Sequence, residues 1–93
     1  MYYVRNYIVF GYIQIFKGEV LNFTNHYKKG LFKGICVYTS SSSPDILKIG
    51  DKINKLGIWD NDELYEENDP EFAIKYFAEL LQIKDNETLI KNI

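Results

Sequence analysis

The sequence has very few of the residues from which metal sites and nucleophilic sites are built. Its 93 residues include one cysteine and one histidine, whereas a zinc site of nitrogen and sulfur ligands needs three or four such side chains. Cys36 follows Ile35 and precedes Val37, so we expect a buried apolar side chain rather than a nucleophile. A single cysteine also favours a reducing compartment, and hence a cytoplasmic location. We therefore expect no metal, no cofactor and no enzymatic activity.

Long apolar runs are missing as well. The most apolar stretch, Tyr2–Phe16, is interrupted by Arg5, Asn6 and Gln14. It is also shorter than the roughly 20 apolar residues that a membrane-spanning helix needs. The stretch lacks the basic start and the small-residue cleavage site of a signal peptide. We therefore expect neither a membrane anchor nor a secretory leader.

Arginine and alanine are scarce, with one arginine beside ten lysines and only two alanines. Together with the many Ile, Asn and Tyr residues, this bias indicates an AT-rich genome, as in certain bacteria, archaea and their viruses. Aromatic residues are abundant, at 16% of the chain, and each can bury on the order of 150–250 Å² of surface. A single domain over residues 1–93 can therefore build an adequate core without disulfides or metals.

The stretch Tyr2–Phe16 has the composition of a β-strand. Its β-branched and aromatic side chains are stiff near the backbone and suit a pleated surface. They follow one another with a period near two, which leaves both faces apolar. Gly11 indicates either a sharp bend in one long strand or a tight hairpin, and both interpretations fit the pattern. In either case we expect this stretch at the centre of a sheet.

Further strands are predicted in the rest of the N-terminal part. Lys17-Gly18 is a short turn signal, and a return strand is expected over 19–24. Residues 25–30 are polar and end in glycine, which indicates a second, looser turn before a strand over 31–39. The result is an antiparallel β-meander of three strands, or of four if Gly11 is a turn.

The character of the chain changes at the serine run 40–43, which we interpret as a linker. Ser43-Pro44 is a typical helix start, and Gly57 is a typical helix end. Between them, apolar residues recur at steps of three, four and three, which predicts one amphipathic helix. These apolar positions are Ile46, Ile49, Ile53 and Leu56. Ile58-Trp59 is expected to enter the core after this helix.

More helices are predicted within the C-terminal part, 44–93. Asp69-Pro70-Glu71 repeats the helix-start signal, residues 72–84 carry a broad apolar face, and a last short helix is expected from Glu87. These predictions give an α+β fold, in which two or three helices pack mainly on one face of the sheet formed by 1–39. If helices cover only that face, a homodimer would cover the other.

Charge is distributed unevenly along the chain. Residues 1–39 carry five basic residues and one acidic residue, whereas residues 40–93 carry six lysines and twelve acidic residues. Residues 60–71 hold seven acidic residues and no basic one, which predicts a solvated loop with one helical turn around Leu64-Tyr65. Such a segment suits a partner protein with a basic surface, because complementary charge raises the association rate and the selectivity. The candidate partner-binding residues are Asp60, Asp62, Glu63, Tyr65, Glu66, Glu67 and Asp69.

These observations favour a small, non-enzymatic protein-interaction module, such as an inhibitor or modulator encoded by a virus or mobile element. The alternative is a nucleic-acid-binding protein. In that case lysines of the basic half would contact phosphates, and exposed aromatic side chains of the sheet would stack on bases. The candidate residues for this alternative are Lys28, Lys29, Phe32, Lys33 and Tyr38.

Overall fold

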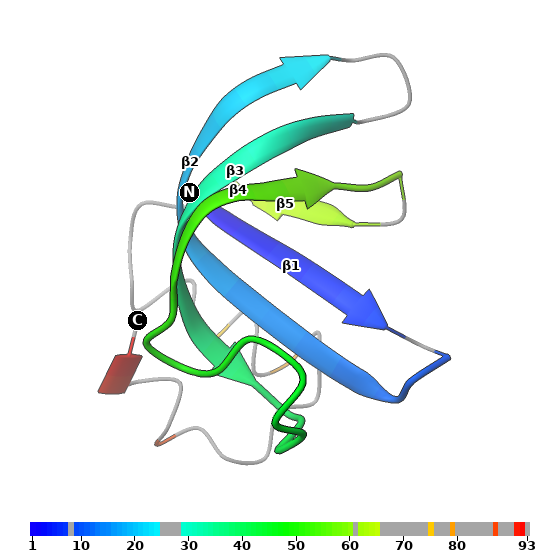
Figure 1. Cartoon of the computed structure of the whole chain (residues 1–93), viewed down its shortest axis with the longest axis vertical. Helices are drawn as coiled ribbons and strands as arrows, with labels where there is room; N and C mark the ends of the chain where they lie inside the picture. Colours follow the sequence, from blue (N-terminus) through cyan, green and yellow to red (C-terminus); the bar gives the residue numbers. More distant parts are fainter. Residues whose placement is uncertain are drawn as a thin grey trace.

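In this computed structural model, one antiparallel sheet of five strands makes up most of the part of the chain that the structure describes (Figure 1). The structure describes residues 1–7, 9–24, 29–60 and 62–65, together with Lys75, Glu79, Glu87, Lys91 and Asn92. The strands are β1 (Tyr2–Tyr7), β2 (Tyr12–Thr24), β3 (Lys29–Thr39), β4 (Lys52–Ile58) and β5 (Glu63–Tyr65). Their order across the sheet is β4-β3-β2-β1-β5.

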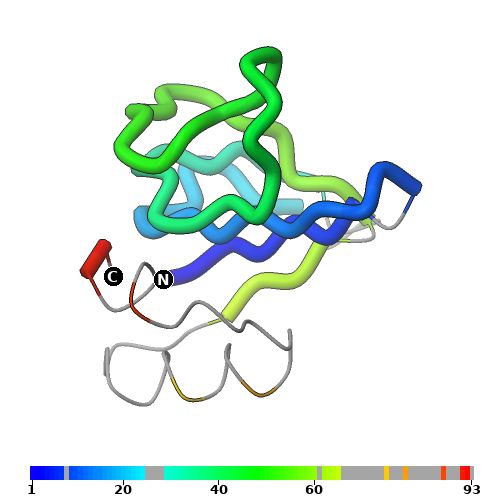
Figure 2. Tube along the Cα trace, turned by 90° about the horizontal axis from the view of Figure 1, so that it is seen from below, coloured from blue at the N-terminus to red at the C-terminus, as the bar shows by residue number. Residues whose placement is uncertain are grey.

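The sheet is strongly curled. β2 and β3 bend along their length (Figure 1), and their pairing shifts register between Ile15 and Phe16 and again between Val20 and Asn22. The strands β4 and β5 follow each other in the chain although they form opposite edges of the sheet. Because only residues 59–62 connect them, the sheet curls until its two edges approach each other. Figure 2 shows β4 and the segment before it folded over β1 and β2.

Side chains inside the curl form the main core. In its centre the ring of Tyr3 packs against Phe16 and Phe32, with ring centroids 5.5 and 5.4 Å apart. Each buried apolar side chain of this size stabilises the fold by about 1.5–3 kcal/mol relative to exposure. This inner cluster consists of Tyr3, Phe16, Phe32, Cys36, Ile53 and Ile58.

A second apolar cluster lies on the outer face of the sheet. Neighbouring residues of β1 belong to different clusters, because successive side chains of a strand point to opposite faces. The outer cluster consists of Tyr2, Val4, Ile15, Val37 and Tyr38. All five side chains are buried within one chain, so this face does not itself require a second copy, and the homodimer stays a prediction.

The α+β prediction is wrong. Strands account for 62% of the described residues and helical conformation for only 8%. The described residues form five strands and no continuous helix. The described residues with helical backbone are Lys75, Glu79, Glu87, Lys91 and Asn92. The remaining positions of the helices predicted over 72–84 and from Glu87 lie outside the described residues. Within the described residues, no helix is long and apolar enough to cross a membrane.

The helix predicted between Ser43-Pro44 and Gly57 is also wrong, because β4 occupies its second half. Gly50, with a φ of 95°, has a left-handed backbone conformation that a continuous helix does not tolerate. Ile53 lies opposite Gly34, whereas Leu56 lies opposite Phe32, with a register shift between the two pairs. β4 therefore has one residue more than β3 here. This β-bulge produces the spacing of three that imitates a helix.

The structure selects the hairpin at Gly11. The N–H of Gly11 donates a hydrogen bond to the carbonyl oxygen of Tyr7 at 2.7 Å. The φ of Gly11 is 73°, a conformation that glycine adopts without steric cost. β1 and β2 then pair from Tyr7–Tyr12 to Tyr2–Lys17. For a turn at Gly11 we predicted four strands in the N-terminal meander. The described residues of this part form three, because β2 continues without a break from Tyr12 to Thr24.

Gly18 lies inside β2, so the turn predicted at Lys17-Gly18 and the separate strand over 19–24 are wrong. Gly18 pairs with Gly34 of β3, and a Cβ atom on Gly18 would collide with the carbonyl oxygen of Lys33. The missing side chains let the two backbones approach closely where the sheet bends.

The acidic stretch also departs from the prediction. Glu63–Tyr65 forms β5 and pairs with β1, with Tyr65 opposite Tyr2 and Leu64 opposite Tyr3. The predicted helical turn at Leu64-Tyr65 is therefore wrong. Ile58 is buried as expected, but the side chain of Trp59 is 62% exposed.

Candidate functional site

Asp62, predicted to face a partner, is part of the protein interior. Only 8% of the residue is exposed. Its carboxylate accepts one hydrogen bond from the hydroxyl of Tyr3 and one, at 3.0 Å, from the backbone N–H of Trp59. The same oxygen lies 3.8 Å from Nε of Arg5. Asp62 therefore connects β1 to the segment between β4 and β5.

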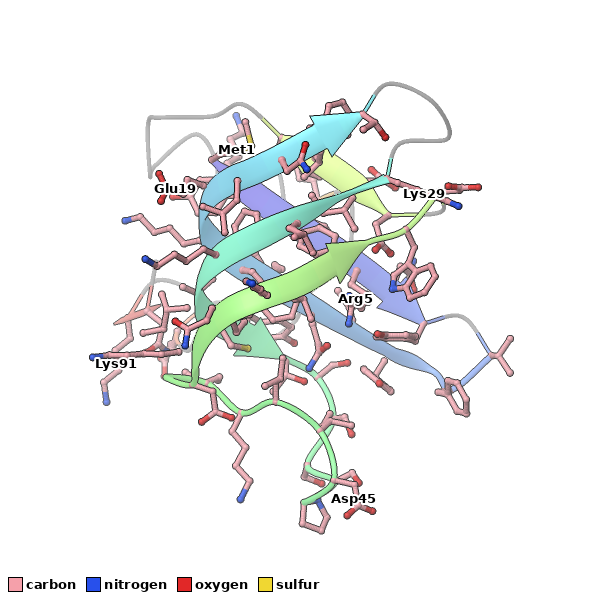
Figure 3. All side chains as sticks on the ribbon, turned by 45° about the horizontal axis from the view of Figure 1, so that its top comes forward. Met1, Arg5, Glu19, Lys29, Asp45 and Lys91 are labelled. Atoms are coloured by element: carbon pink, nitrogen blue, oxygen red, sulfur yellow. The ribbon has the colours of Figure 1, made fainter. Side chains whose placement is uncertain are left out.

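Arg5 completes this buried network. Figure 3 shows it inside the curl, between β1 and β4. Its Nη2 donates to the carbonyl oxygen of Gly57 at 2.7 Å and to the hydroxyl of Tyr3 at 3.0 Å. Its guanidinium group lies 5.2 Å from the ring centroid of Tyr7, within cation–π range. Because the charge of Arg5 is paired and hydrogen-bonded, the network fixes the curl of the sheet without leaving an uncompensated charge.

The hydroxyl of Tyr3 is in its neutral form in this network. Burial is the main cause, and the hydrogen bond to Asp62 adds to it: together they raise the pKa of Tyr3 above its ordinary value. A neutral hydroxyl can donate to the carboxylate while it accepts from Arg5. Burial likewise raises the pKa of Tyr7. Every buried side-chain nitrogen and oxygen among the described residues has a hydrogen-bond partner. The network of Tyr3, Arg5 and Asp62 therefore has a structural role.

The other predicted acidic residues are divided. Asp60 and Glu63 are exposed, and Tyr65 is half-buried, with its hydroxyl donating to the carboxylate of Glu63. Predicted positions Glu66, Glu67 and Asp69 lie outside the described residues. Of the seven candidates, only Asp60 and Glu63 are described as exposed carboxylates.

The residues predicted to bind nucleic acid do not form one surface. Phe32 is fully buried and Tyr38 is 9% exposed, so neither ring can stack on a base. Lys29 and Lys33 are exposed, and Lys28 lies outside the described residues. The structure therefore separates the candidate phosphate contacts from the candidate stacking residues.

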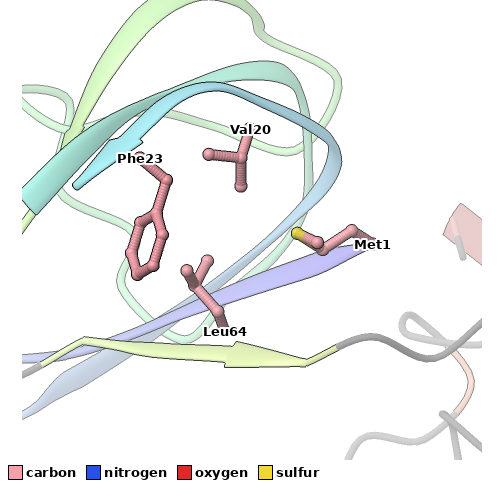
Figure 4. Close-up of a pocket in the computed structure, with 4 residues that line it drawn as sticks. All are labelled: Met1, Val20, Phe23 and Leu64. Carbon is pink, nitrogen blue, oxygen red and sulfur yellow. The ribbon is translucent and has the colours of Figure 1, made fainter. Parts of the chain in front are cut away.

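An apolar pocket that the sequence analysis missed opens between β2 and β5. Figure 4 shows the side chains of Met1, Val20, Phe23 and Leu64 around it. Its volume is about 470 Å³. Val20 and Leu64 also pack against the inner cluster, whereas 41% of Phe23 is exposed. The pocket therefore leads from the surface to the edge of the core.

The pocket lies where β2 loses one of its two neighbouring strands. β1 pairs with β2 only as far as Lys17, and the N–H of Gly18 then donates to the carbonyl oxygen of Met1 at 3.1 Å. Over residues 19–24, β2 has β3 as its single partner strand among the described strands. Among the described strands this part of β2 is therefore a strand edge, and the backbone groups of such an edge can pair with another strand.

A second exposed apolar surface lies at the hairpin between β1 and β2. Val9 and Phe10 are 91% and 74% exposed, and the ring of Phe10 contacts those of Tyr7 and Tyr12. A cavity of about 350 Å³ adjoins this hairpin. Its lining residues are Phe10, Tyr12, Ser41, Ser43 and Ile46.

Sequence reasoning missed the first pocket because its residues come from three separate segments. Leu64 reaches Met1 and Phe23 only because β5 pairs with β1, and β5 lies in a stretch too acidic to suggest a strand. The one available signal was the apolar pair Val20 and Phe23 in the predicted return strand over 19–24. That signal places apolar residues on β2 but does not identify what faces them.

The described residues offer little for catalysis. No three His, Cys, Asp or Glu side chains among them gather in a group that could hold a metal ion. Burial raises the pKa of the Cys36 thiol to about 11, which leaves little of the reactive thiolate at neutral pH. No protein family matches this chain, and neither a curated protein nor a solved structure is detectably similar to it.

Proposed function

We propose that this protein is a small, non-enzymatic interaction module that binds a segment of a partner protein in the pocket between β2 and β5. The observation that carries the proposal is the pocket itself: four apolar side chains surround about 470 Å³ that is open to solvent. The described lining offers no acid, base or nucleophile, so it suits an apolar side chain better than a reaction. Burying one such side chain contributes about 1.5–3 kcal/mol before the costs of association.

Two exposed carboxylates, one in the β4–β5 connection and one at the start of β5, support a role for charge in this interaction. Asp60 and Glu63 are exposed, and no salt bridge to either is described. A basic region on the partner would be attracted to them, which raises the association rate more than the final affinity. Of the acidic surface predicted from the sequence, the proposal therefore uses only these two carboxylates. We infer a cytoplasmic location from the single, buried thiol of Cys36.

Site-specific photo-cross-linking tests the proposal. A photo-reactive phenylalanine analogue at Phe23 should cross-link one protein in cells that naturally produce this chain. The matched control places the same analogue at Leu21, which is similarly exposed, at 46% against 41% for Phe23, but does not line the pocket. A specific product at Phe23 that is absent at Leu21 would support the proposal. No specific product at Phe23, or equal products at both positions, would contradict it.

A further inference from the structure

The hairpin between β1 and β2 carries the most exposed large apolar side chains among the described residues. Val9 is 91% exposed and Phe10 is 74% exposed, so the rest of the chain covers very little of either residue. Figure 1 shows this hairpin projecting outward from the sheet. Apolar side chains at a projecting tip stay in contact with water unless another apolar surface covers them, and such exposure is typical of an interaction site.

The hairpin can enter an apolar environment without burying an unpaired charge. Residues 6–16 contain no charged side chain, and Arg5, which precedes them, is buried and paired within the protein. At the tip, the backbone N–H groups of Phe10 and Gly11 both donate to the carbonyl oxygen of Tyr7, at 3.1 and 2.7 Å. Such internal hydrogen bonds are needed because hydrocarbon offers no water to backbone groups. The composition and the backbone of the tip therefore both suit contact with hydrocarbon.

Aromatic side chains with a polar end lie beside the apolar tip. The ring of Phe10 contacts those of Tyr7 and Tyr12, with centroids 6.3 and 6.5 Å apart, and both tyrosines are half-buried. Trp59, which is 62% exposed, lies in the β4–β5 connection at the same end of the sheet (Figure 1). Arg5 connects the end of β4 to the ring of Tyr7. Tyrosine and tryptophan prefer the boundary between water and hydrocarbon, where the ring and its polar end are both accommodated.

From these observations we infer that the β1–β2 hairpin is a contact site for the surface of a lipid bilayer with zwitterionic headgroups. Val9 and Phe10 enter the boundary of the acyl chains, and the neighbouring tyrosines and Trp59 lie at the level of the headgroups. Lipid chains adapt to a convex tip, whereas a protein partner would need a pocket of matching shape. Only the tip enters the bilayer, so the contact needs no membrane-spanning segment.

A neutral lipid surface fits the hairpin better than an anionic one. The hairpin has no basic side chain to attract anionic lipids, and Asp60, beside Trp59, is an exposed carboxylate that such lipids would repel. The site is also separate from the pocket between β2 and β5, since none of the described residues that line that pocket belongs to the hairpin. The inference can therefore be tested independently of the proposed function.

Flotation of the full chain with phosphatidylcholine vesicles tests the inference. We expect the chain to float with the vesicles. The emission of Trp59, the single tryptophan, should shift to shorter wavelength as its ring leaves water. Raising the salt concentration should change the bound fraction by less than about twofold, because the hairpin contributes no charge to be screened.

Matched variants locate the contact. Phe10→Asp should lower the partition coefficient into the vesicles by about tenfold or more, because the new carboxylate opposes entry into hydrocarbon. Leu21→Asp introduces the same charge at a residue that is 46% exposed and lies toward the other end of β2, and it should change the coefficient by less than about twofold. Thermal melting shows whether both variants fold. If Phe10→Asp does not fold, Phe10→Ser replaces it with the same expected direction.

Vesicle binding that Phe10→Asp abolishes and Leu21→Asp retains, together with the shift in Trp59 emission, would support the inference. If the unmodified chain does not bind phosphatidylcholine vesicles, or if Phe10→Asp binds them equally well, the tip is not a lipid contact. If binding requires phosphatidylserine and disappears at high salt, basic residues elsewhere are responsible, which also overturns the inference. If the chain ignores vesicles but forms a dimer that Phe10→Asp separates, a second copy covers the tip and the lipid contact is wrong.

Discussion

Replacing Asp62 by alanine should destabilise the fold far more than an ordinary surface substitution. The change removes the acceptor of two hydrogen bonds, from Tyr3 and from the N–H of Trp59. It also leaves the charge of Arg5 without the carboxylate that lies 3.8 Å away. The two charged side chains are only 9% and 7% exposed, and removing one partner of a buried pair costs about 3–5 kcal/mol. Since small domains are stable by about 5–15 kcal/mol, this variant loses a large share of its stability.

Urea unfolding followed by circular dichroism measures this loss. The matched control is Asp60→Ala, an exposed acid two residues away, which should change the free energy of unfolding by less than about 0.5 kcal/mol. The double variant Arg5→Met, Asp62→Ala should lose less than the sum of the single variants, with a coupling of about 1–3 kcal/mol. A loss below about 1 kcal/mol for Asp62→Ala would refute the structural role of the network. Additivity within about 0.5 kcal/mol would refute the coupling.

Three further predictions follow from single residues. Gly18→Ala should lower the urea midpoint strongly or prevent folding, because the new Cβ collides with the carbonyl oxygen of Lys33; a midpoint within error of the unmodified chain would contradict the close approach of β2 and β3. Cys36, with a pKa raised by burial to about 11, should react with iodoacetamide at pH 8 only slowly, and rapidly in urea; equal rates would show an accessible thiol. The raised pKa of Tyr3 means that the folded state holds the hydroxyl proton more tightly than the unfolded chain does. The contribution of this proton to the free energy of unfolding is therefore complete below about pH 10 and is lost as the pH rises further. In Tyr3→Phe the free energy of unfolding should therefore fall less steeply with pH above about pH 10 than in the unmodified chain. An equally steep fall in both proteins would show that Tyr3 is not its cause.

The first part of the fold could be predicted from local composition. β-Branched and aromatic residues with a period of two indicated strands in the regions of β1, β2 and β3, and Gly11 indicated a turn as one of two alternatives. Gly18 was misleading for a physical reason. A glycine before a polar residue looks the same in sequence whether it forms a turn or lets two strands approach, and only its pairing with Gly34 distinguishes the two.

The second part could not be predicted, because tertiary pairing overrides local pattern there. Ile53 and Leu56 follow a helix-like step of three, which here arises from a bulge against β3. Glu63–Tyr65 has weak strand propensity and becomes a strand because β1 offers it an edge. Asp62 looked like one of several equivalent surface acids. Its partner Arg5 is 57 positions earlier in the chain, and no local pattern connects the two.

The pairing of β5 with β1 has a consequence for how this chain folds. Tyr2 and Tyr65 are opposite each other in the ladder although 62 residues lie between them, so closing this contact carries a large loop-entropy cost. The local hairpins between the first three strands can form before that cost is met. We therefore expect β5 to join the sheet late, during or after synthesis of the chain up to residue 65. A nascent chain that ends before residue 63 would present the outer edge of β1 to solvent and to other chains.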